Sequence, residues 1–534
     1  MKIKSKQKIF IIFILLISLN SFIGCNNNPN NINKDGIVMY VGNNIFENSL
    51  DPIKGGMSYG YPFINDALLQ VNKDSGYEGD LADSYEVSDD ALEYTFKLKQ
   101  GIKFSDGSDF NAEDVVFTYQ TVKNNQGENE NVDLTKLASV KAEDDYTVEF
   151  ILSEPYSPFI DTVACLGIVP SDNYDSKKFD KYPIGTGAYK VVQYDANQQI
   201  IVEANDKYYG NKPEINKATL VYMDPETAFS TAKSGQLDVV MVGANYSSEN
   251  IDGMTLEKFE TMDVRNISLP TLKTTTIKDA EGKDITVGND VTSDINVRKA
   301  LSIGLDRKTI IKNAFNGVGK IAEGFTDNLI WANTETYDDN QVDQANKILD
   351  DAGWIIDKKD GIRKKDGIKC EFNVYAPSSD NDRYLLATAT AEDAKKLGIR
   401  INVKQATWDE ILTLQNTAGV VWGWGQYSPT VLKSLFYSDM FQSGAYDNVV
   451  GYSNDEVDKQ INNAINSNNQ EDAINSWKNV QEIANKDYPY LYLVNIEHCY
   501  FINNSLDISK ETQIAHPHGH GSPIVCNMKD WKYK

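Results

Sequence analysis

The chain has 534 residues, of which 77 are acidic and 52 are basic, and its formal net charge is −25. This acidic balance argues against nucleic acid as a partner and suits a soluble body outside the cell. A chain of this length is too long for one ordinary hydrophobic core, so we expect two or more lobes. No second long apolar run follows the one at the N-terminus, and we expect no membrane span beyond it.

Residues 1–24 have the pattern of a secretory signal peptide. Lysines at positions 2, 4, 6 and 8 precede an apolar run over residues 9–19, which is too short to be a spanning helix. The segment ends in FIGC, which resembles a bacterial lipobox with Phe22 in the place of the usual Leu. The resemblance implies a lipid on Cys25 and anchoring to the cell membrane on its extracytoplasmic face. The alternatives are an uncleaved anchor and a plain signal with a free cysteine.

The next segments predict a tether and a first strand. Residues 25–35 are polar and lack an apolar period, so we expect a flexible tether between the lipid and the body. The apolar run from Ile37 to Val41 predicts the first strand. An aromatic stretch follows, in which Tyr59 and Tyr61 stand between Met57 and Phe63.

Residues 79–119, GDLADSYEVSDDALEYTFKLKQGIKFSDGSDFNAEDVVFTY, carry a clear local pattern. Apolar and polar residues alternate from Leu92 to Leu98, which is the period of a half-buried strand. Asn111, followed by Asp114 and an apolar run, predicts the N-cap of a helix. The stretch therefore predicts a strand, a hairpin, a second strand and a helix.

As a string, this stretch closely resembles the signature region of the family 5 extracellular solute-binding proteins, the receptors of peptide and nickel ABC importers. Other elements of that family match in order, at residues 50–52 (LDP), 154–159 (EPYSPF), 183–190 (PIGTGAYK), 205–213 (NDKYYGNKP) and 296–307 (NVRKALSIGLDR). The resemblance runs from about Asp51 to Val494. The glycines of PIGTGAYK lack the Lys-Ser/Thr of a phosphate loop, and we interpret them as a tight crossover between lobes.

The resemblance implies a two-lobed clamshell of the periplasmic-binding-protein type. The expected parts are lobe I over residues 36–68, 183–270 and 490–534, an inserted subdomain of lobe I over residues 69–182, and lobe II over residues 271–489. The residue patterns alone predict only an α/β chain with more than one domain, for example a helix over residues 385–397 that leads into an alternating strand at residues 399–403.

The same resemblance implies a transport receptor and not an enzyme. Its lobes close on a small solute, and an ABC permease with its ATPase recognises the closed, monomeric protein. A secreted metal-dependent hydrolase is a remote alternative, because the His-x-His pair is not followed by the further ligands that such enzymes need. The non-lipid cysteines have no C-x-x-C spacing, and they either stay free or form two disulfides in one of three pairings. They are Cys165, Cys370, Cys499 and Cys526.

The first indication of the ligand class comes from residues 420–429, VVWGWGQYSP. Peptide receptors of the family commonly place an Asp here, which pairs with the α-amino group of the ligand, and the matching position is Gly425. A buried ammonium without a carboxylate costs several kcal/mol, so the usual anchoring of a peptide is not expected. A one-residue misalignment, or substitution by Asp409 or Asp439, is the alternative.

Other candidate ligand contacts are aromatic or basic. The segment that contains Trp422, Trp424 and Tyr427 resembles that of the nickel receptors of the family more than that of the peptide receptors. Tyr59 belongs to a stretch that faces the cleft in relatives, and it is equally well placed in a core. Arg383 opens a helix of lobe II, where its guanidinium is a candidate clamp for a ligand carboxylate. Three further arginines are interpreted as surface or helix-end charges, namely Arg298, Arg307 and Arg400.

All four histidines lie in the last 37 residues. His516, His518 and His520 are spaced i, i+2 and i+4, on one side of an extended chain. Imidazole suits nickel, copper and zinc, so these three are candidate metal ligands. We expect no cofactor; our preferred ligand is a nickel chelate carried as cargo, and a di- or oligopeptide is the alternative. Two competing interpretations of the histidines are an exposed tail that scavenges metal and a structural turn.

Overall fold

The structure is a computed structural model, and it describes residues 36–47, 49–56, 63–125, 128–129, 132–279, 281–333, 336, 338–517 and 523–534. The expected signal peptide and tether, including Cys25, lie outside these residues, as do Tyr59, His518 and His520. Within the described ranges, no helix combines the length and the apolar character that crossing a membrane requires.

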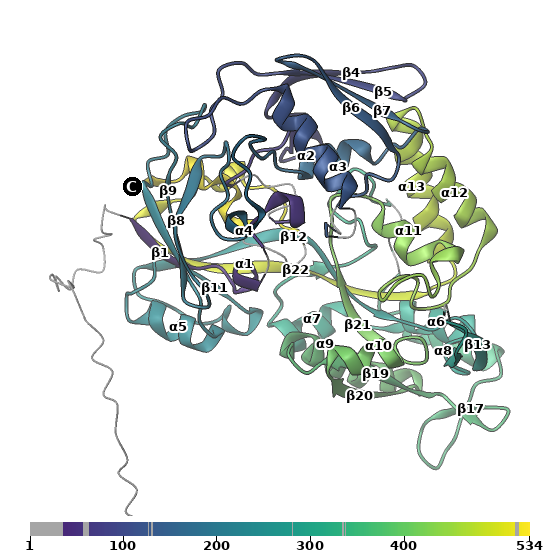
Figure 1. The fold of residues 1–534 in the computed structure, drawn as a ribbon. Coiled ribbons are helices and arrows are strands. Elements are labelled where there is room, and N and C mark those ends of the chain that lie inside the picture. The colour runs from purple at the N-terminus through teal and green to yellow at the C-terminus, as the bar shows by residue number, and fades with distance from the viewer. Residues whose placement is uncertain are drawn as a thin grey trace, which may run out of the picture.

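Two long strands connect the lobes of the molecule. β12 (Met254–Ser268) and β22 (Tyr490–Asn503) pair antiparallel along most of their length. They lie within an 11-stranded sheet of order β20-β19-β21-β12-β22-β11-β1-β10-β9-β8, with β15 on β22. One end of this order belongs to lobe I and the other to lobe II, so the same two strands run through both lobes (Figure 1).

Lobe I is built on parallel strands joined by a helical crossover. β1 (Ile37–Tyr40) lies between β10 (Lys217–Val221) and β11 (Val239–Val242) and pairs parallel with both. Helix α5 (Pro225–Lys233) connects β10 to β11, as a parallel pair requires. Antiparallel strands β9 (Gln199–Ala204) and β8 (Tyr189–Asp195) complete this side of the sheet. The strand predicted after residue 36 is confirmed as β1.

The inserted subdomain is a four-stranded antiparallel sheet with helices against it. The strand order is β4 (Ala82–Val87), β5 (Glu93–Leu98), β7 (Thr147–Leu152) and β6 (Leu137–Asp144). The predicted alternation is confirmed in β5, whose apolar side chains are buried and whose polar ones are exposed or half-buried. Helix α2 (Ala112–Asn124) begins at the predicted cap, where Asn111 and Asp114 form a capping box. Helix α3 (Phe159–Cys165) follows β7.

Lobe II has its own group of parallel strands and most of the helices. β19 (Glu371–Pro377) lies between β20 (Arg400–Ala406) and β21 (Gly419–Trp424), and β21 joins β12. The helix predicted from residue 385 begins earlier, because Asp380 caps it, and is α9 (Asn381–Ala394). The other helices are α6 (Ile295–Gly304), α7 (Arg307–Phe315), α8 (Val342–Asp351), α10 (Trp408–Leu414), α11 (Val431–Phe436), α12 (Asp455–Ile465) and α13 (Gln470–Asn485).

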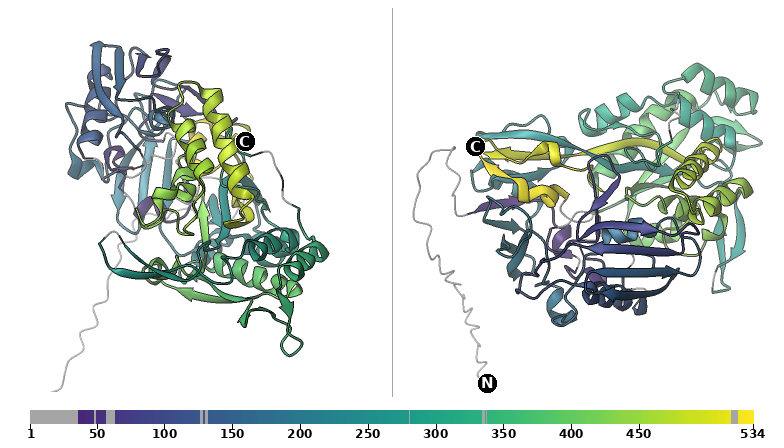
Figure 2. Two further views of the ribbon diagram at one scale, coloured as in Figure 1. Left: turned by 90° about the vertical axis from the view of Figure 1, so that its right-hand side faces the viewer. Right: turned by 90° about the horizontal axis from the view of Figure 1, so that it is seen from above.

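Short elements complete the described chain: α1 (Asn44–Glu47), β2 (Leu69–Val71), β3 (Tyr77–Gly79), α4 (Ser176–Phe179), β13 (Thr275–Lys278), β14 (Asp284–Val287), β15 (Lys320–Ile321), β16 (Ile355–Ile356), β17 (Arg363–Lys365), β18 (Ile368–Lys369), β23 (Leu506–Asp507) and β24 (Lys532–Tyr533). The inserted subdomain lies beside α12 and α13 of lobe II in every view (Figures 1 and 2). The expected fold, a mixed α/β clamshell with two lobes, is confirmed.

The hydrophobic core continues from the inserted subdomain into lobe II. One cluster of buried side chains contains residues of both, among them Phe96, Phe150 and Phe159 with Phe436 and Trp477. Hydrogen bonds cross the same boundary, since Ser157 N donates to Ile465 O at 2.8 Å and Ser157 Oγ donates to Ala464 O at 2.8 Å. In this structure the two parts are therefore closed on each other.

The two segments that join lobe I to the inserted subdomain pass each other at close range. A Cβ on Gly185 would lie 1.9 Å from the carbonyl oxygen of Ile64, and one on Gly187 would lie 2.8 Å from the same atom. Gly187 N donates a 2.9 Å hydrogen bond to that carbonyl. Glycine is needed at both positions because the two backbones lie too close together for a Cβ atom to fit between them.

Two arginines that were interpreted as surface or helix-end charges are buried. Arg298 is 5% exposed and donates to the carbonyl of Asp487 at 2.9 Å. Arg307 is 1% exposed, donates to the carbonyl of Tyr492 at 2.7 Å and pairs with Asp339 at 2.8 Å. They connect helices α6 and α7 to strand β22 and the residues before it. The surface interpretation is wrong for both, whereas Arg307 does stand at a helix end, as the first residue of α7.

Candidate ligand-binding site

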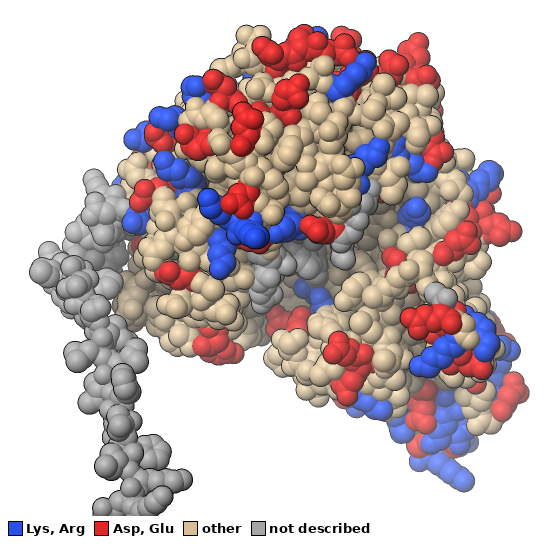
Figure 3. Space-filling model, viewed as in Figure 1, with Lys and Arg blue, Asp and Glu red and all other residues tan. Residues whose placement is uncertain are grey.

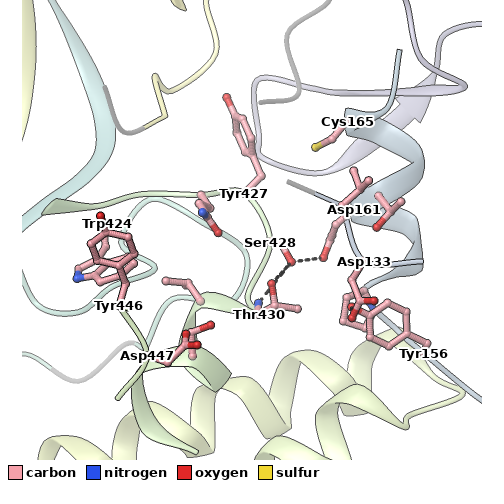
Figure 4. Close-up of a pocket in the computed structure, with 16 residues that line it drawn as sticks. Asp133, Tyr156, Asp161, Cys165, Trp424, Tyr427, Ser428, Thr430, Tyr446 and Asp447 are labelled. Carbon is pink, nitrogen blue, oxygen red and sulfur yellow. Dashed lines mark hydrogen bonds between the residues drawn. The ribbon is translucent and has the colours of Figure 1, made fainter. Parts of the chain in front are cut away.

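A cavity of about 250 Å³ lies between the inserted subdomain and lobe II. The molecule is hollowed between its lobes on the face seen in Figure 3, with acidic and basic side chains interspersed around the hollow. In the close-up of the cavity, one wall comes from the inserted subdomain and the other from lobe II (Figure 4). The first wall carries Asp133, Tyr156, Asp161 and Cys165, and the second carries Trp424, Tyr427, Ser428, Tyr446 and Asp447.

Helical spacing explains how α3 supplies its part of the wall. Phe159 and Val163, four residues apart, are 1% and 0% exposed and pack into the core. Asp161 and Cys165, also four residues apart, therefore lie on the other face of the helix and line the cavity. On the lobe II side, β21 ends at Trp424, and the loop that follows brings further residues to the cavity.

Asp161 is the buried carboxyl group of the cavity, with 4% of its surface exposed. It accepts a hydrogen bond from the hydroxyl of Tyr77 in the inserted subdomain and one of 2.9 Å from Ser428 Oγ in lobe II. Burial raises the pKa of Asp161 from 3.8 to about 7, and these hydrogen bonds lower it only in part. The carboxyl group is thus close to the midpoint of its titration at neutral pH, and a cation beside it would favour the charged form.

The other charged side chains of the cavity are acidic as well. Asp133 accepts a 3.3 Å hydrogen bond from the hydroxyl of Tyr156, and Asp447 follows Tyr446 on the opposite wall. The described residues that line the cavity include no Lys, Arg or His. Trp424 adds a further aromatic ring. Carboxylates combined with aromatic rings suit an organic cation.

The thiol of Cys165 is inert in this setting. Burial, and then the neighbouring Asp161, raise its pKa to about 12, so it is protonated at neutral pH and is a poor nucleophile and metal ligand. All four described cysteines are free. In the part of the chain that the structure describes, no three His, Cys, Asp or Glu side chains are placed to hold a metal ion together.

Of the aromatic residues predicted as ligand contacts, Trp424 and Tyr427 line the cavity. The hydroxyl of Tyr427 donates to the carbonyl of Ala515 at 2.7 Å, which fixes the ring. Trp422 does not line it; the side chain is 3% exposed and its Nε1 donates to Ser268 Oγ at 3.2 Å. Its ring centroid lies 6.1 Å from that of Trp424, so Trp422 packs behind the wall.

Close packing of the backbone accounts for the glycine at position 425. A Cβ on Gly425 would lie 2.7 Å from the carbonyl oxygen of Met262 and 2.9 Å from the Cα of Asp263. An Asp at this position would therefore collide with strand β12. The substitutes that we considered, Asp409 and Asp439, are exposed and do not line the cavity. The carboxylates that do line the cavity belong to Asp133, Asp161 and Asp447.

Arg383 opens α9, as predicted, and does not line the cavity. It is 7% exposed, its Nε lies 3.1 Å from the carboxylate of Asp380, and its guanidinium lies 5.3 Å from the ring centroid of Trp408. Burial, and then the nearby Arg265, lower its pKa to about 10, so it stays charged at neutral pH. Its role as a carboxylate clamp remains a prediction.

His516 is fully buried, with 0% of its surface exposed. Its Nδ1 lies 3.0 Å from Nδ1 of His498, its Nε2 lies 3.3 Å from Oε1 of Gln513, and its ring stacks on Phe259. Burial, and then His498, lower its pKa well below the usual value, so the ring is neutral. Both ring nitrogens have protein partners, and neither is open to a metal ion in this arrangement. The predicted metal role of His518 and His520 falls outside the described residues.

Sequence reasoning did not single out the residues that give the cavity its charge. For Asp161 a signal existed, because it follows the family-like EPYSPF segment and is the charged residue of a mostly apolar helix. For Asp133 and Asp447 the sequence offers no signal. Both lie outside helices and strands, and their approach depends on how the subdomain packs against lobe II.

Sequence comparisons agree with this architecture. The family described as "Bacterial extracellular solute-binding proteins, family 5 Middle" matches residues 76–475. Protein XP55 of Streptomyces lividans is 29% identical over 493 residues, which cover 89% of this chain and 87% of that protein. The oligopeptide-binding protein AppA of Bacillus subtilis is 28% identical over 452 residues, which cover 80% of this chain and 78% of that protein.

Solved structures show the same fold. The structure of NikZ from Campylobacter jejuni in complex with Ni(L-His) matches with a TM-score of 0.76 at 22% identity, and the match covers 94% of this chain and 100% of that one. At this identity the likeness concerns the fold alone. Because the family match spans most of the chain, this protein belongs to family 5 of the bacterial extracellular solute-binding proteins.

Proposed function

We propose that this protein is the solute-binding receptor of an ABC importer of the peptide and nickel class, and that its ligand is a short peptide held by its α-ammonium group. The observation that carries the proposal is the cavity lining, which has the carboxylates of Asp133, Asp161 and Asp447 and no basic side chain among its described residues. Binding and lobe closure are sufficient for this function, and no chemical step is needed.

Asp161 is the anchor for the ammonium group. An ionised carboxylate has about four acceptor positions, and Tyr77 and Ser428 use one each. An ammonium group carries three donors, and its pairing with a buried carboxylate is stronger than the same pairing in water. The carboxylate that peptide receptors commonly place at the position of Gly425 is thus supplied from α3.

The size of the cavity favours a small ligand. A volume of about 250 Å³ lies just below the range of about 300–1,000 Å³ that is typical of small-molecule pockets. This suits a di- or tripeptide better than a long oligopeptide. The aromatic rings of Tyr156, Trp424 and Tyr446 offer contact surface to its apolar parts.

A nickel chelate, which the sequence favoured, is the competing ligand. Trp424 and Tyr427, on which that preference rested, line the cavity. Nickel prefers imidazole, however, and the described lining contains none, while His516 is engaged by His498 and Gln513. We therefore place the peptide first and include nickel in the test.

We further infer that a lipid on Cys25 anchors the protein to the extracytoplasmic face of the cell membrane, where a permease with its ATPase receives the closed monomer. The FIGC string and the membership in an extracellular receptor family support this inference. Cys25→Ser should release the protein from the membrane fraction. Unchanged fractionation, together with an N-terminal peptide that carries no acyl mass, would contradict it.

Tryptophan fluorescence tests the ligand assignment, because Trp424 lines the cavity. The titrants are a pool of free tripeptides, the same pool with acetylated N-termini, nickel alone, and nickel with histidine. We expect the free pool to bind and the acetylated pool not to bind. Asp161→Asn should weaken binding about 100-fold, as expected for a buried charge pair that loses one partner.

Asp439→Asn is the matched control, since Asp439 is exposed and does not line the cavity. This variant should bind the free tripeptides as wild type does. A response to nickel or nickel–histidine that Asp161→Asn retains, without any response to free tripeptides, would overturn the peptide assignment in favour of the chelate.

A further inference from the structure

A second cavity, of about 160 Å³, adjoins the first at Asp161. It too lies between the inserted subdomain and lobe II, and Pro158 and Asp161 line both cavities. On the lobe II side, Ser428 lines the first cavity and Pro429, the next residue, lines the second. The two cavities therefore share one wall.

The lining of the second cavity combines aromatic rings with a polar stretch, Ser467, Asn468, Asn469 and Gln470. It includes Tyr77, Tyr85, Tyr94 and Trp331, and the described residues around it include no Lys, Arg or His. Tyr94 and Trp331 are 4% and 6% exposed, which fixes their rings, and Trp331 Nε1 donates to the carbonyl of Tyr427 at 2.9 Å. An apolar cavity of about 150 Å³ binds benzene. The second cavity thus has the size for one aromatic ring, and four aromatic side chains line it.

A hydrogen bond between lobe II and the inserted subdomain lies in the wall that the two cavities share. Ser428 of lobe II donates to Asp161 at 2.9 Å, whereas Tyr77, the other donor, belongs to the inserted subdomain itself. Separation of the lobes would break the hydrogen bond from Ser428 to Asp161 and keep that from Tyr77, and it would join the two cavities into one cleft beside Asp161. A ligand that enters the open cleft reaches Asp161 with a part on either side before the lobes close.

We propose that the second cavity is a side-chain pocket of the same receptor, and that it takes the aromatic ring of the residue whose ammonium group pairs with Asp161. This inference rests on the proposed function. The receptor then selects peptides with an aromatic N-terminal residue, whose ring enters the second cavity while the rest of the peptide occupies the first. Burial of a phenyl ring favours such a peptide by about tenfold or more over one with N-terminal Ala.

Two tripeptide pools that differ only in their first residue, Phe or Ala, test the pocket. Gln470→Trp fills the second cavity from its rim, because Gln470 is exposed and lines that cavity. Glu471→Trp is the matched control, since Glu471 is the next residue of α13, is exposed and lines neither cavity. Affinities are read by tryptophan fluorescence and checked by calorimetry.

We expect wild type and Glu471→Trp to bind the Phe pool about tenfold or more tightly than the Ala pool. Gln470→Trp should lose this difference and keep the affinity of wild type for the Ala pool. Equal binding of both pools by wild type, with loss on N-acetylation, would overturn the aromatic pocket and leave the proposed function standing. A preference for Phe that Gln470→Trp retains would also overturn the pocket. Failure of both free-amine pools to bind would instead overturn the proposed function.

Discussion

Ser428 and Asp161 are joined by a 2.9 Å hydrogen bond although they stand 267 positions apart in the chain. Ser428 follows β21 in lobe II, and Asp161 lies in α3 of the inserted subdomain. The bond links the two walls of the ligand cavity, and it ends on a carboxyl group whose pKa burial raises to about 7. If the proposed ammonium group pairs with Asp161, the residue that binds the ligand also forms a contact between the closed lobes.

We expect the affinity for a free-amine ligand to fall as the pH drops below about 7. Asp161 must be charged to pair with an ammonium group, and protons compete for the same carboxylate. The loss should approach tenfold per pH unit below about pH 7. Asp161→Asn cannot titrate and should bind weakly with a flat profile. Fluorescence titrations between about pH 5 and pH 8 measure this, and a wild-type profile as flat as that of the variant would contradict it.

The same carboxyl group predicts how stability without ligand depends on pH. Its folded pKa of about 7 lies above the unfolded value of 3.8, so the folded state binds more protons between these values and its stability falls as the pH rises through them. The full window corresponds to about 4 kcal/mol, which Asp161→Asn removes. Urea unfolding at two pH values, about 5 and 8, should show the variant gaining on wild type at the higher pH. A constant gap would count against the buried, titrating carboxyl group.

Gly425→Asp should not create a peptide anchor. Its Cβ would lie 2.7 Å from the carbonyl oxygen of Met262, and we expect the free energy of unfolding to drop by about 1–3 kcal/mol as in other overpacked sites. Gly76→Ala is the control, because its Cβ would lie 3.3 Å from the side chain of Asn72, which can adjust. A Gly425→Asp protein that keeps wild-type stability and binds tripeptides more tightly would contradict this account.

His516 should act as a structural histidine whose protonation destabilises the fold. Burial and the neighbouring His498 lower its pKa, so below about pH 6.5 the unfolded state binds more protons and stability falls with falling pH. His516→Gln should show a smaller loss of stability than wild type between about pH 7.5 and pH 5.5, as measured by urea unfolding. Equal losses in the two proteins, or a nickel-dependent stabilisation that the variant lacks, would favour a different role for His516.

Much of the fold could be predicted from the sequence because its signals are local. The alternation in β5 and the capping box of Asn111 and Asp114 depend on residues that are close in the chain. The start of α9 was predicted four residues too late, because the apolar pattern begins after the turn that Asp380 caps. The resemblance to a receptor family supplied the two-lobed arrangement, which periodicity does not contain.

The site could be predicted only in part. Trp424 and Tyr427, which the sequence predicts as ligand contacts, line the cavity, and their role in binding stays a prediction. Asp133 and Asp447 were missed because they come from the inserted subdomain and lobe II and line one cavity only when these pack together. The resemblance to peptide receptors led us to expect an acid at position 425, whereas the backbone of β12 that leaves no room for a side chain there becomes visible only in the structure.

Hydrogen exchange of the ligand-saturated protein tests the central claim most directly, which is that a free-amine solute binds between the inserted subdomain and lobe II. With a saturating free tripeptide, we predict added protection of the backbone amides in residues 159–165 and 424–431, which form the two walls. Residues 508–517 around His516 should change little. Protection confined to residues 508–517, or no change in either wall at proven saturation, would contradict the account.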